Sequence, residues 1–127
     1  MFETQYAASE RPDAGRVITK AALSAAQRLG INSRTLGLVL GLSEPTVSRM
    51  KSGEYLLATG SKAYELAVLL VRMFRSLDAI TGGDEKVTRA WMGNANTALD
   101  GTPAEKIRTI TGLFDVVAYL DARRALL

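Results

Sequence analysis

Two glycines four residues apart constrain the fold of this chain more than any other feature. Two short helices can cross closely only where the contact residue is small and where the turn between them admits a left-handed conformation. Gly37 supplies the small contact and Gly41 supplies the turn, while Leu40 and Leu42 on either side can fill the space between the helices. The segment 34–53 is therefore predicted to form a helix-turn-helix.

The second helix of this motif is expected to keep one face exposed. Ser43 can cap the helix, Pro45 in its first turn loses no hydrogen bond, and Gly53 ends it. Val47 and Met50 lie three residues apart and are predicted to point inward. At about 100° per residue, the opposite face carries the following side chains: Pro45, Ser48, Arg49 and Ser52.

An exposed face of this kind enters the major groove of DNA in helix-turn-helix proteins. Arg49 can donate two hydrogen bonds to a guanine edge or hold a phosphate, and Ser48 can contact either group. Thr46 and Lys51 lie on the flanks, where they face the DNA backbone. An αα-hairpin used only for packing is the alternative. The candidate DNA-binding residues are Ser43, Pro45, Thr46, Ser48, Arg49, Lys51 and Ser52.

The rest of the chain shows helical periodicity and no convincing strand pattern. Segment 1–14 has no periodicity and is expected to be a loose tail, and a first helix is expected from about Gly15 to Leu29. Segment 62–80 is apolar around most of its circumference, so several sides must be covered. Because a chain this small can hardly cover it alone, this helix is expected to contribute to a homodimer or a dimer of dimers.

The C-terminal part reads as a small helical domain. Asp84 can cap a short helix that ends near Trp91, which is expected to be a core anchor. Thr102-Pro103-Ala104-Glu105 has the pattern of a capping box. A last helix is expected from Gly112. The fold is thus predicted to be all-α, with these parts: tail 1–14, helix-turn-helix bundle 15–60, long central helix 61–82 and C-terminal helical domain 83–127.

Composition excludes several classes of function. The chain has no Cys and no His, which removes disulfides, thiolate nucleophiles, Cys/His zinc sites and the most common general base. No phosphate loop or nucleophile motif is found, so we expect no enzyme activity, metal or cofactor. The longest apolar stretch, 66–71, is far short of the ~20 residues that cross a bilayer. Glu3 also stands where a signal peptide has basic residues, so a cytoplasmic protein without a membrane partner is expected.

Charge distribution adds a weaker hint. Residues 1–59 carry seven Lys/Arg and five Asp/Glu, whereas residues 84–127 carry six of each. A basic N-terminal part and a neutral C-terminal part fit a protein that binds DNA with the first and a protein partner with the second. Ordinary surface charge explains the same counts equally well.

Two parts of the chain resemble known families. The run 38–49, LVLGLSEPTVSR, closely resembles the Xre (phage-repressor-like) helix-turn-helix family. It departs at Glu44, where such proteins often have Gln, and a carboxylate repels phosphate unless it accepts from a cytosine amine. The runs 96–103, 112–113 and 116–124 look like the Xre/MbcA/ParS toxin-binding domain, with Asp100 where that family usually has Gly.

This resemblance implies an antitoxin of a type II toxin–antitoxin system that binds operator DNA and represses its own operon. Its partner would be a RES-domain toxin, a class that consumes or modifies with NAD, and inhibition in the family comes from the C-terminal domain covering the toxin's active site. By that analogy the candidate toxin contacts are Tyr119, Asp121, Arg123, Arg124, Ala125, Leu126 and Leu127.

Other interpretations of these residues stay open. Arg123 or Arg124 can occupy a pocket for a phosphate-bearing cofactor such as NAD, or can merely offset the negative end of the last helix. Tyr119 could equally be a packed amphipathic side chain. Two alternatives to the antitoxin remain: a stand-alone repressor whose C-terminal half only dimerises, and an interaction protein whose helix-turn-helix no longer binds DNA.

Overall fold

The computed structural model describes the backbone of residues 2–127 and the side chains of residues 13–127. Within these residues every regular element is helical, apart from an isolated bridge between Asn96 and Gly101. The all-α prediction is therefore confirmed. In chain order the elements are α1 (Phe2–Leu29), α2 (Ser33–Leu40), α3 (Glu44–Ser52), α4 (Lys62–Thr81), α5 (Glu85–Gly93), the 3-10 turn η1 (Thr97–Leu99), α6 (Pro103–Lys106) and α7 (Ile110–Arg124).

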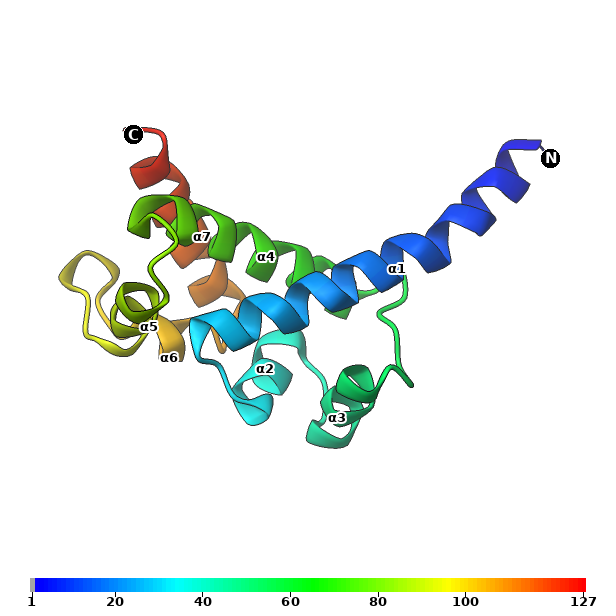
Figure 1. Cartoon of the computed structure of the whole chain (residues 1–127), viewed down its shortest axis with the longest axis horizontal. Helices are drawn as coiled ribbons and strands as arrows, with labels where there is room; N and C mark the ends of the chain where they lie inside the picture. The colour runs from blue at the N-terminus through cyan, green and yellow to red at the C-terminus, as the bar shows by residue number, and fades with distance from the viewer. Residues whose placement is uncertain (1) are drawn as a thin grey trace.

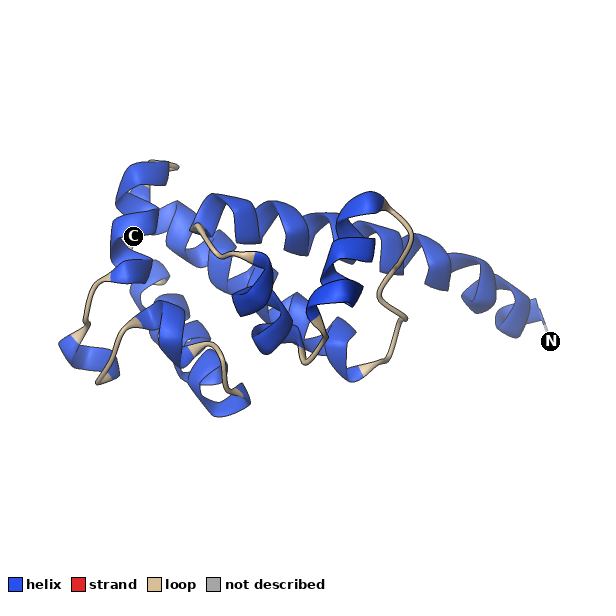
Figure 2. Cartoon of the chain, turned by 90° about the horizontal axis from the view of Figure 1, so that it is seen from below, coloured by secondary structure: helices blue, strands red, loops and turns tan. Residues whose placement is uncertain are grey.

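Helix α4 is the central element of the molecule. It packs most extensively against α7 and α1, and it also contacts α2 and α5. Figure 1 shows α2 and α3 together below α1, while α5, α6 and α7 gather at the end away from the N-terminus. The N-terminal end of α1 projects beyond the other helices in Figure 1 and again in the view from below in Figure 2.

A single chain covers most of α4, contrary to our expectation. Four large apolar side chains of this helix are at most 6% exposed: Leu66, Leu70, Met73 and Leu77. Among the described large apolar residues of α4, only Val68 is exposed, at 39%. The apolar circumference is explained by α1, α2, α5 and α7 of the same chain, so it does not by itself require a dimer. No described helix is long and apolar enough to span a membrane.

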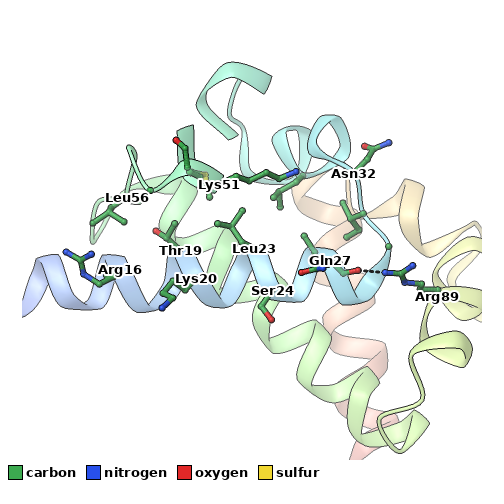
Figure 3. Close-up of a pocket in the computed structure, with 17 residues that line it drawn as sticks. Arg16, Thr19, Lys20, Leu23, Ser24, Gln27, Asn32, Lys51, Leu56 and Arg89 are labelled. Atoms are coloured by element: carbon green, nitrogen blue, oxygen red, sulfur yellow. Dashed lines mark hydrogen bonds between the residues drawn. The ribbon is translucent and has the colours of Figure 1, made fainter. Parts of the chain in front are cut away.

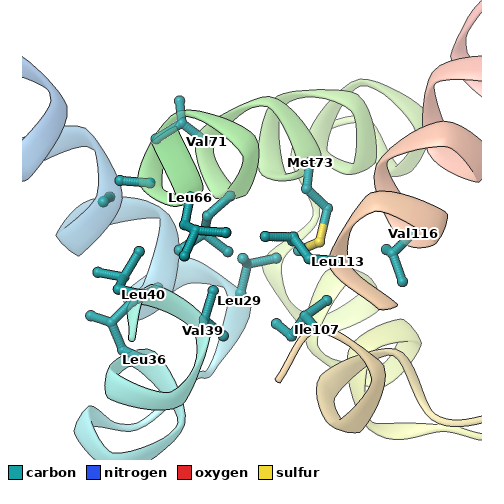
Figure 4. Close-up of a cluster of buried hydrophobic side chains, with 14 of the residues drawn as sticks. Leu29, Leu36, Val39, Leu40, Leu66, Val71, Met73, Ile107, Leu113 and Val116 are labelled. Carbon is teal, nitrogen blue, oxygen red and sulfur yellow. The ribbon is translucent and has the colours of Figure 1, made fainter. Parts of the chain in front are cut away.

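One apolar core joins the two halves of the chain. Buried side chains from four helices point toward one another in this core (Figure 4): Leu29 of α1, Leu36 of α2, Leu66 and Met73 of α4, and Leu113 of α7. Removing this apolar surface from water is the main force that holds the helices together. Because the core is shared, the helix-turn-helix and the C-terminal helices position each other.

Four helix starts have polar caps at positions that the sequence indicates, which are Ser43, Ser61, Asp84 and either Asn32 or Ser33. The side chains of Asn32, Ser43, Ser61 and Asp84 each accept a hydrogen bond from the backbone N–H three residues further along, at the starts of α2, α3, α4 and α5. Each bond satisfies one of the N–H groups that a helix start leaves without a partner. The predicted caps at Ser43, Ser61 and Asp84 are confirmed, and of the two candidates for α2 it is Asn32 that caps the helix.

Two helix starts and one cap differ from the predictions. α1 begins at Phe2 rather than near Gly15, so residues 2–14 are helical although they lack apolar periodicity. A helix that extends past the core needs no apolar stripe. α6 is a single turn, and the Thr102 side chain makes no capping hydrogen bond, so the predicted capping box does not form. α7 starts at Ile110, because Thr109 caps it by accepting from Gly112 N–H.

Candidate DNA-binding and toxin-binding surfaces

α2 and α3 cross at Gly37. A Cβ added there would lie 2.6 Å from the carbonyl oxygen of Leu42, closer than non-bonded atoms approach each other. Gly41 ends α2 with a left-handed φ of 71°, and its N–H donates to the carbonyl of Gly37. Val47 and Met50 are buried beneath α3. The predicted roles of both glycines in this motif are confirmed.

The outward face of α3 is open to a ligand. Pro45, Ser48, Arg49 and Ser52 are all exposed. The Arg49 guanidinium donates to the hydroxyl of Thr46 at 3.2 Å, which holds its side chain along the helix surface. A short polar side chain beside a long cationic one is a suitable pair for base edges and phosphates in a major groove.

The residues at the edges of this face also have structural partners. The Ser43 hydroxyl accepts from Thr46 N–H at 3.3 Å and lies 2.9 Å from the Thr46 hydroxyl, so Ser43 is first of all a cap. The Lys51 ammonium donates to the Ser33 hydroxyl at the start of α2. Glu44 is exposed in the first turn of α3, where its charge faces the positive end of the helix dipole. That position accounts for Glu44 without a base contact.

Asp121 links α7 to α4 through both of its carboxylate oxygens. Oδ2 lies 2.6 Å from Nη2 of Arg72, and Oδ1 accepts a hydrogen bond of 2.8 Å from the hydroxyl of Ser76. Ser76 is fully buried, although in the sequence it belongs with Lys62, Glu65 and Arg72 to the narrow polar stripe of α4. Both oxygens have partners within the chain, so Asp121 supports the packing of α7 whatever else it contacts.

Trp91, Tyr119 and Arg123 form an aromatic and cationic cluster between α5 and α7. The rings of Trp91 and Tyr119 stack with their centroids 6.4 Å apart and their planes at 15°, and the Arg123 guanidinium lies 5.9 Å from the Tyr119 centroid. Both rings are half-buried, so Trp91 packs at the edge of the core rather than inside it. Beside the cluster is a hollow of about 190 Å³, lined by Leu77, Ile80, Thr81, Val87, Trp91, Tyr119, Leu120 and Arg123.

The last candidate residues lie on the other side of the molecule from α3. Arg124 and Ala125 are exposed, and Leu126 and Leu127 are 83% and 78% exposed. Figure 1 shows the end of α7 separated from α3 by α4 and α1. The two sets of candidate residues therefore form two distinct surfaces.

Two family models match consecutive parts of the chain. Residues 9–72, about half of it, match the antitoxin Xre-like helix-turn-helix domain, and residues 76–125 match the antitoxin Xre/MbcA/ParS C-terminal toxin-binding domain. The chain belongs to the Xre-like antitoxin family. It is thus the antitoxin of a toxin–antitoxin system, as the resemblance predicted. A comparison with curated proteins found no match.

The two matches of this Xre-like antitoxin meet inside α4, within the segment 61–82 that the sequence predicts as a separate central helix. Arg72 is the last residue of the helix-turn-helix match, and Ser76 is the first residue of the toxin-binding match. Asp121 of α7 holds both, so the network described above connects the two segments of the antitoxin.

The backbone angles of the antitoxin at Asp100 account for the glycine that the family usually has at this position. Asp100 has φ 55° and ψ 46°. Among the described residues it is the only one other than glycine with a left-handed backbone. This region costs about 1–2 kcal/mol for most residues and less for Asp or Asn, and glycine adopts it without penalty. The loop therefore keeps a shape that suits the glycine usual in this family.

Sequence reasoning missed part of the C-terminal surface of the antitoxin. Ile80 and Val87 line the hollow beside Tyr119, yet neither was a candidate. One signal was present, because Val87 and Trp91 are four residues apart and share a face of α5. The partners across the hollow come from α4 and α7, and periodicity within one helix does not identify them.

Proposed function

We propose that this antitoxin neutralises a RES-domain toxin with the surface around Trp91, Tyr119 and Arg123, and that it represses its own operon with the outward face of α3. One observation carries the first part. Every residue that lines the hollow beside the aromatic cluster lies within 76–125, the segment that matches the toxin-binding domain. The RES class of the partner rests on the resemblance of the C-terminal motifs.

The aromatic cluster has the chemistry of a binding surface. Trp, Tyr and Arg are the side chains that most often dominate protein interfaces, because they bury large areas and still form polar contacts. Here the stacked rings hold each other, and the Asp121 network fixes α7 beneath them. A surface ordered before binding loses little side-chain entropy when the partner arrives. An apolar side chain of the toxin would enter the hollow of about 190 Å³.

Two exposed valines offer a matched test of this surface. Val87 borders the hollow and is 49% exposed, whereas Val17 lies on α1 and is 63% exposed. Val87→Glu is expected to weaken toxin binding at least tenfold, because a carboxylate would border the hollow that an apolar side chain of the toxin is proposed to enter. Val17→Glu is expected to bind like wild type. The readout is co-purification with the toxin encoded by the neighbouring gene, with circular dichroism to verify folding. Equal binding by both variants would contradict this placement of the interface.

The RES assignment is tested through cellular NAD. Expression of the neighbouring gene alone should lower NAD and stop growth, and co-expression of the antitoxin should restore both. A toxin that arrests growth while NAD stays constant would exclude a RES toxin of this kind but not an antitoxin.

In the same assay, a folded variant with Arg123→Ala and Arg124→Ala tests whether the two arginines of the antitoxin occupy a phosphate-binding pocket of the toxin. Full protection by that variant would leave them the simpler role of offsetting the helix dipole.

For repression, we propose a homodimer or a dimer of dimers on an inverted repeat with half-sites about one helical turn, or a multiple, apart. The support is the exposed face of α3, which as a single helix reads only a few base pairs. Gel shifts with the region upstream of the gene should show specific binding, and light scattering should show a dimer at micromolar concentration. A monomer in solution would contradict the dimer, and absence of binding at low salt would contradict the repressor role.

A further inference from the structure

A basic groove runs between α1 and the helix-turn-helix, on the flank of α3 that carries Lys51 (Figure 3). Its volume is about 940 Å³. None of its 17 lining residues is acidic, although the chain contains 13 Asp and Glu residues. The groove has these four cations: Arg16, Lys20, Lys51 and Arg89.

Three elements position these cations. Arg16 and Lys20 are four residues apart on α1, so they share a face and are about 6 Å apart along the helix axis. Lys51 reaches from the end of α3 to the Ser33 hydroxyl and so crosses one part of the groove. Arg89 of α5 closes the far end, where it donates to the carbonyl of Gln27 at 2.7 Å (dashed in Figure 3).

The charge of the groove is only partly compensated within the described part of the chain, because Arg89 pairs with Glu85 at 3.1 Å. Arg16 and Lys20 are both exposed, and neither makes an ion pair with a described acidic side chain. Leu36 and Met50 form part of an apolar floor. A cleft that combines charges of one sign with low-dielectric walls concentrates the field and attracts ions of opposite charge.

We infer that this groove holds the sugar–phosphate backbone of the operator strand that borders the major groove occupied by α3. Ser52 belongs both to the outward face of α3 and to the lining of the groove, so a duplex docked on α3 must bring a backbone to this flank. Arg89 lies in the segment that matches the toxin-binding domain, and the bound strand therefore contacts both segments of the antitoxin. The inference rests on the proposed DNA binding by α3.

The test is the salt dependence of DNA binding. Fluorescence anisotropy is measured between about 50 and 300 mM salt with a labelled upstream duplex and a scrambled duplex of equal length. The variant Arg16→Ala with Lys20→Ala is compared with a control, Arg75→Ala with Arg108→Ala. The control removes the same charge at two exposed positions that do not line the groove. Co-purification with the toxin verifies that both variants are folded.

Each lost phosphate contact reduces the slope of log K against log salt by about 1, so the groove variant should lose about 2. At about 0.1 M salt it should bind both duplexes roughly 10- to 100-fold more weakly. The control should change the slope by less than about 0.5. A groove variant that behaves like the control would overturn the inference and leave the repressor role intact, whereas a wild type that binds neither duplex would overturn both. Tight binding of inorganic phosphate or ATP that needs Arg16 and Lys20, with DNA affinity unchanged, would also overturn it.

Discussion

Replacing Asp121 by alanine should destabilise the antitoxin, because it leaves the buried hydroxyl of Ser76 without an acceptor. Ser76 is fully buried, and its hydroxyl donates to Asp121 Oδ1 at 2.8 Å. Without that acceptor a buried polar group loses its partner, which costs about 1–3 kcal/mol. The ion pair with Arg72 adds only about 0–1 kcal/mol, because the arginine side chain is 62% exposed and well screened. We expect Asp121→Ala to lower the free energy of unfolding by about 2 kcal/mol.

Two further variants separate the hydrogen bond from the ion pair. Asp121→Asn keeps an oxygen that can accept from Ser76 and loses only the charge opposite Arg72, so it should cost less than about 1 kcal/mol. Ser76→Ala removes the donor. When combined with Asp121→Ala it should therefore cost less than the sum of the single changes, with a coupling of roughly 1–2 kcal/mol. Urea unfolding followed by far-UV circular dichroism measures the wild type, the three single variants and the double variant.

Two results would refute this account of Asp121. In one, the losses of unfolding free energy in Asp121→Ala and Ser76→Ala are strictly additive in the double variant. In the other, Asp121→Asn is as unstable as Asp121→Ala. The asparagine variant also separates structure from binding. If it folds like wild type and binds toxin normally, Asp121 acts within the antitoxin. If it folds and loses the toxin, the carboxylate is a contact residue, as the family resemblance implies.

Substitutions at three other positions have expected outcomes. Gly37→Ala should cost about 1–3 kcal/mol in urea unfolding, because its methyl group meets the carbonyl of Leu42; a neutral effect would mean that the α2–α3 crossing relaxes easily. Asp100→Gly should raise the free energy of unfolding by up to about 1 kcal/mol and Asp100→Ala should lower it, since φ is positive there; the reverse order would contradict the left-handed backbone. Arg49→Ala should weaken promoter binding by roughly 1–3 kcal/mol, and an equal loss on scrambled DNA would reassign Arg49 to a phosphate.

Much of the fold was predictable because its signals are local. The caps at Asn32, Ser43, Ser61 and Asp84 act within one turn of the chain, so these four helix starts could be placed from neighbouring residues. The boundary of α1 was not predictable in this way. Our prediction followed the apolar stripe, and the helix continues for more than three turns beyond it.

The candidate surfaces were predictable to different degrees. The exposed face of α3 follows from helix geometry and from inward Val47 and Met50, and the structure places those side chains as predicted. The C-terminal surface was only partly predictable. Tyr119 and Arg123 were candidates from the resemblance, but the stacking on Trp91 and the hollow beside Val87 require α5 and α7 to be packed together.

The sequence by itself determined that this chain is helical, that a small residue and a left-handed turn allow α2 and α3 to cross, and that Ser48 and Arg49 face outward. Each of these properties depends on residues within a few positions of one another, where backbone geometry permits few choices. Only the tertiary structure decided which polar residues became internal. Ser76 stands in the polar stripe of α4 and is buried because α7, 45 residues further along, brings the Asp121 carboxylate to its hydroxyl. A pairing across that separation depends on how whole helices pack, which no local pattern specifies.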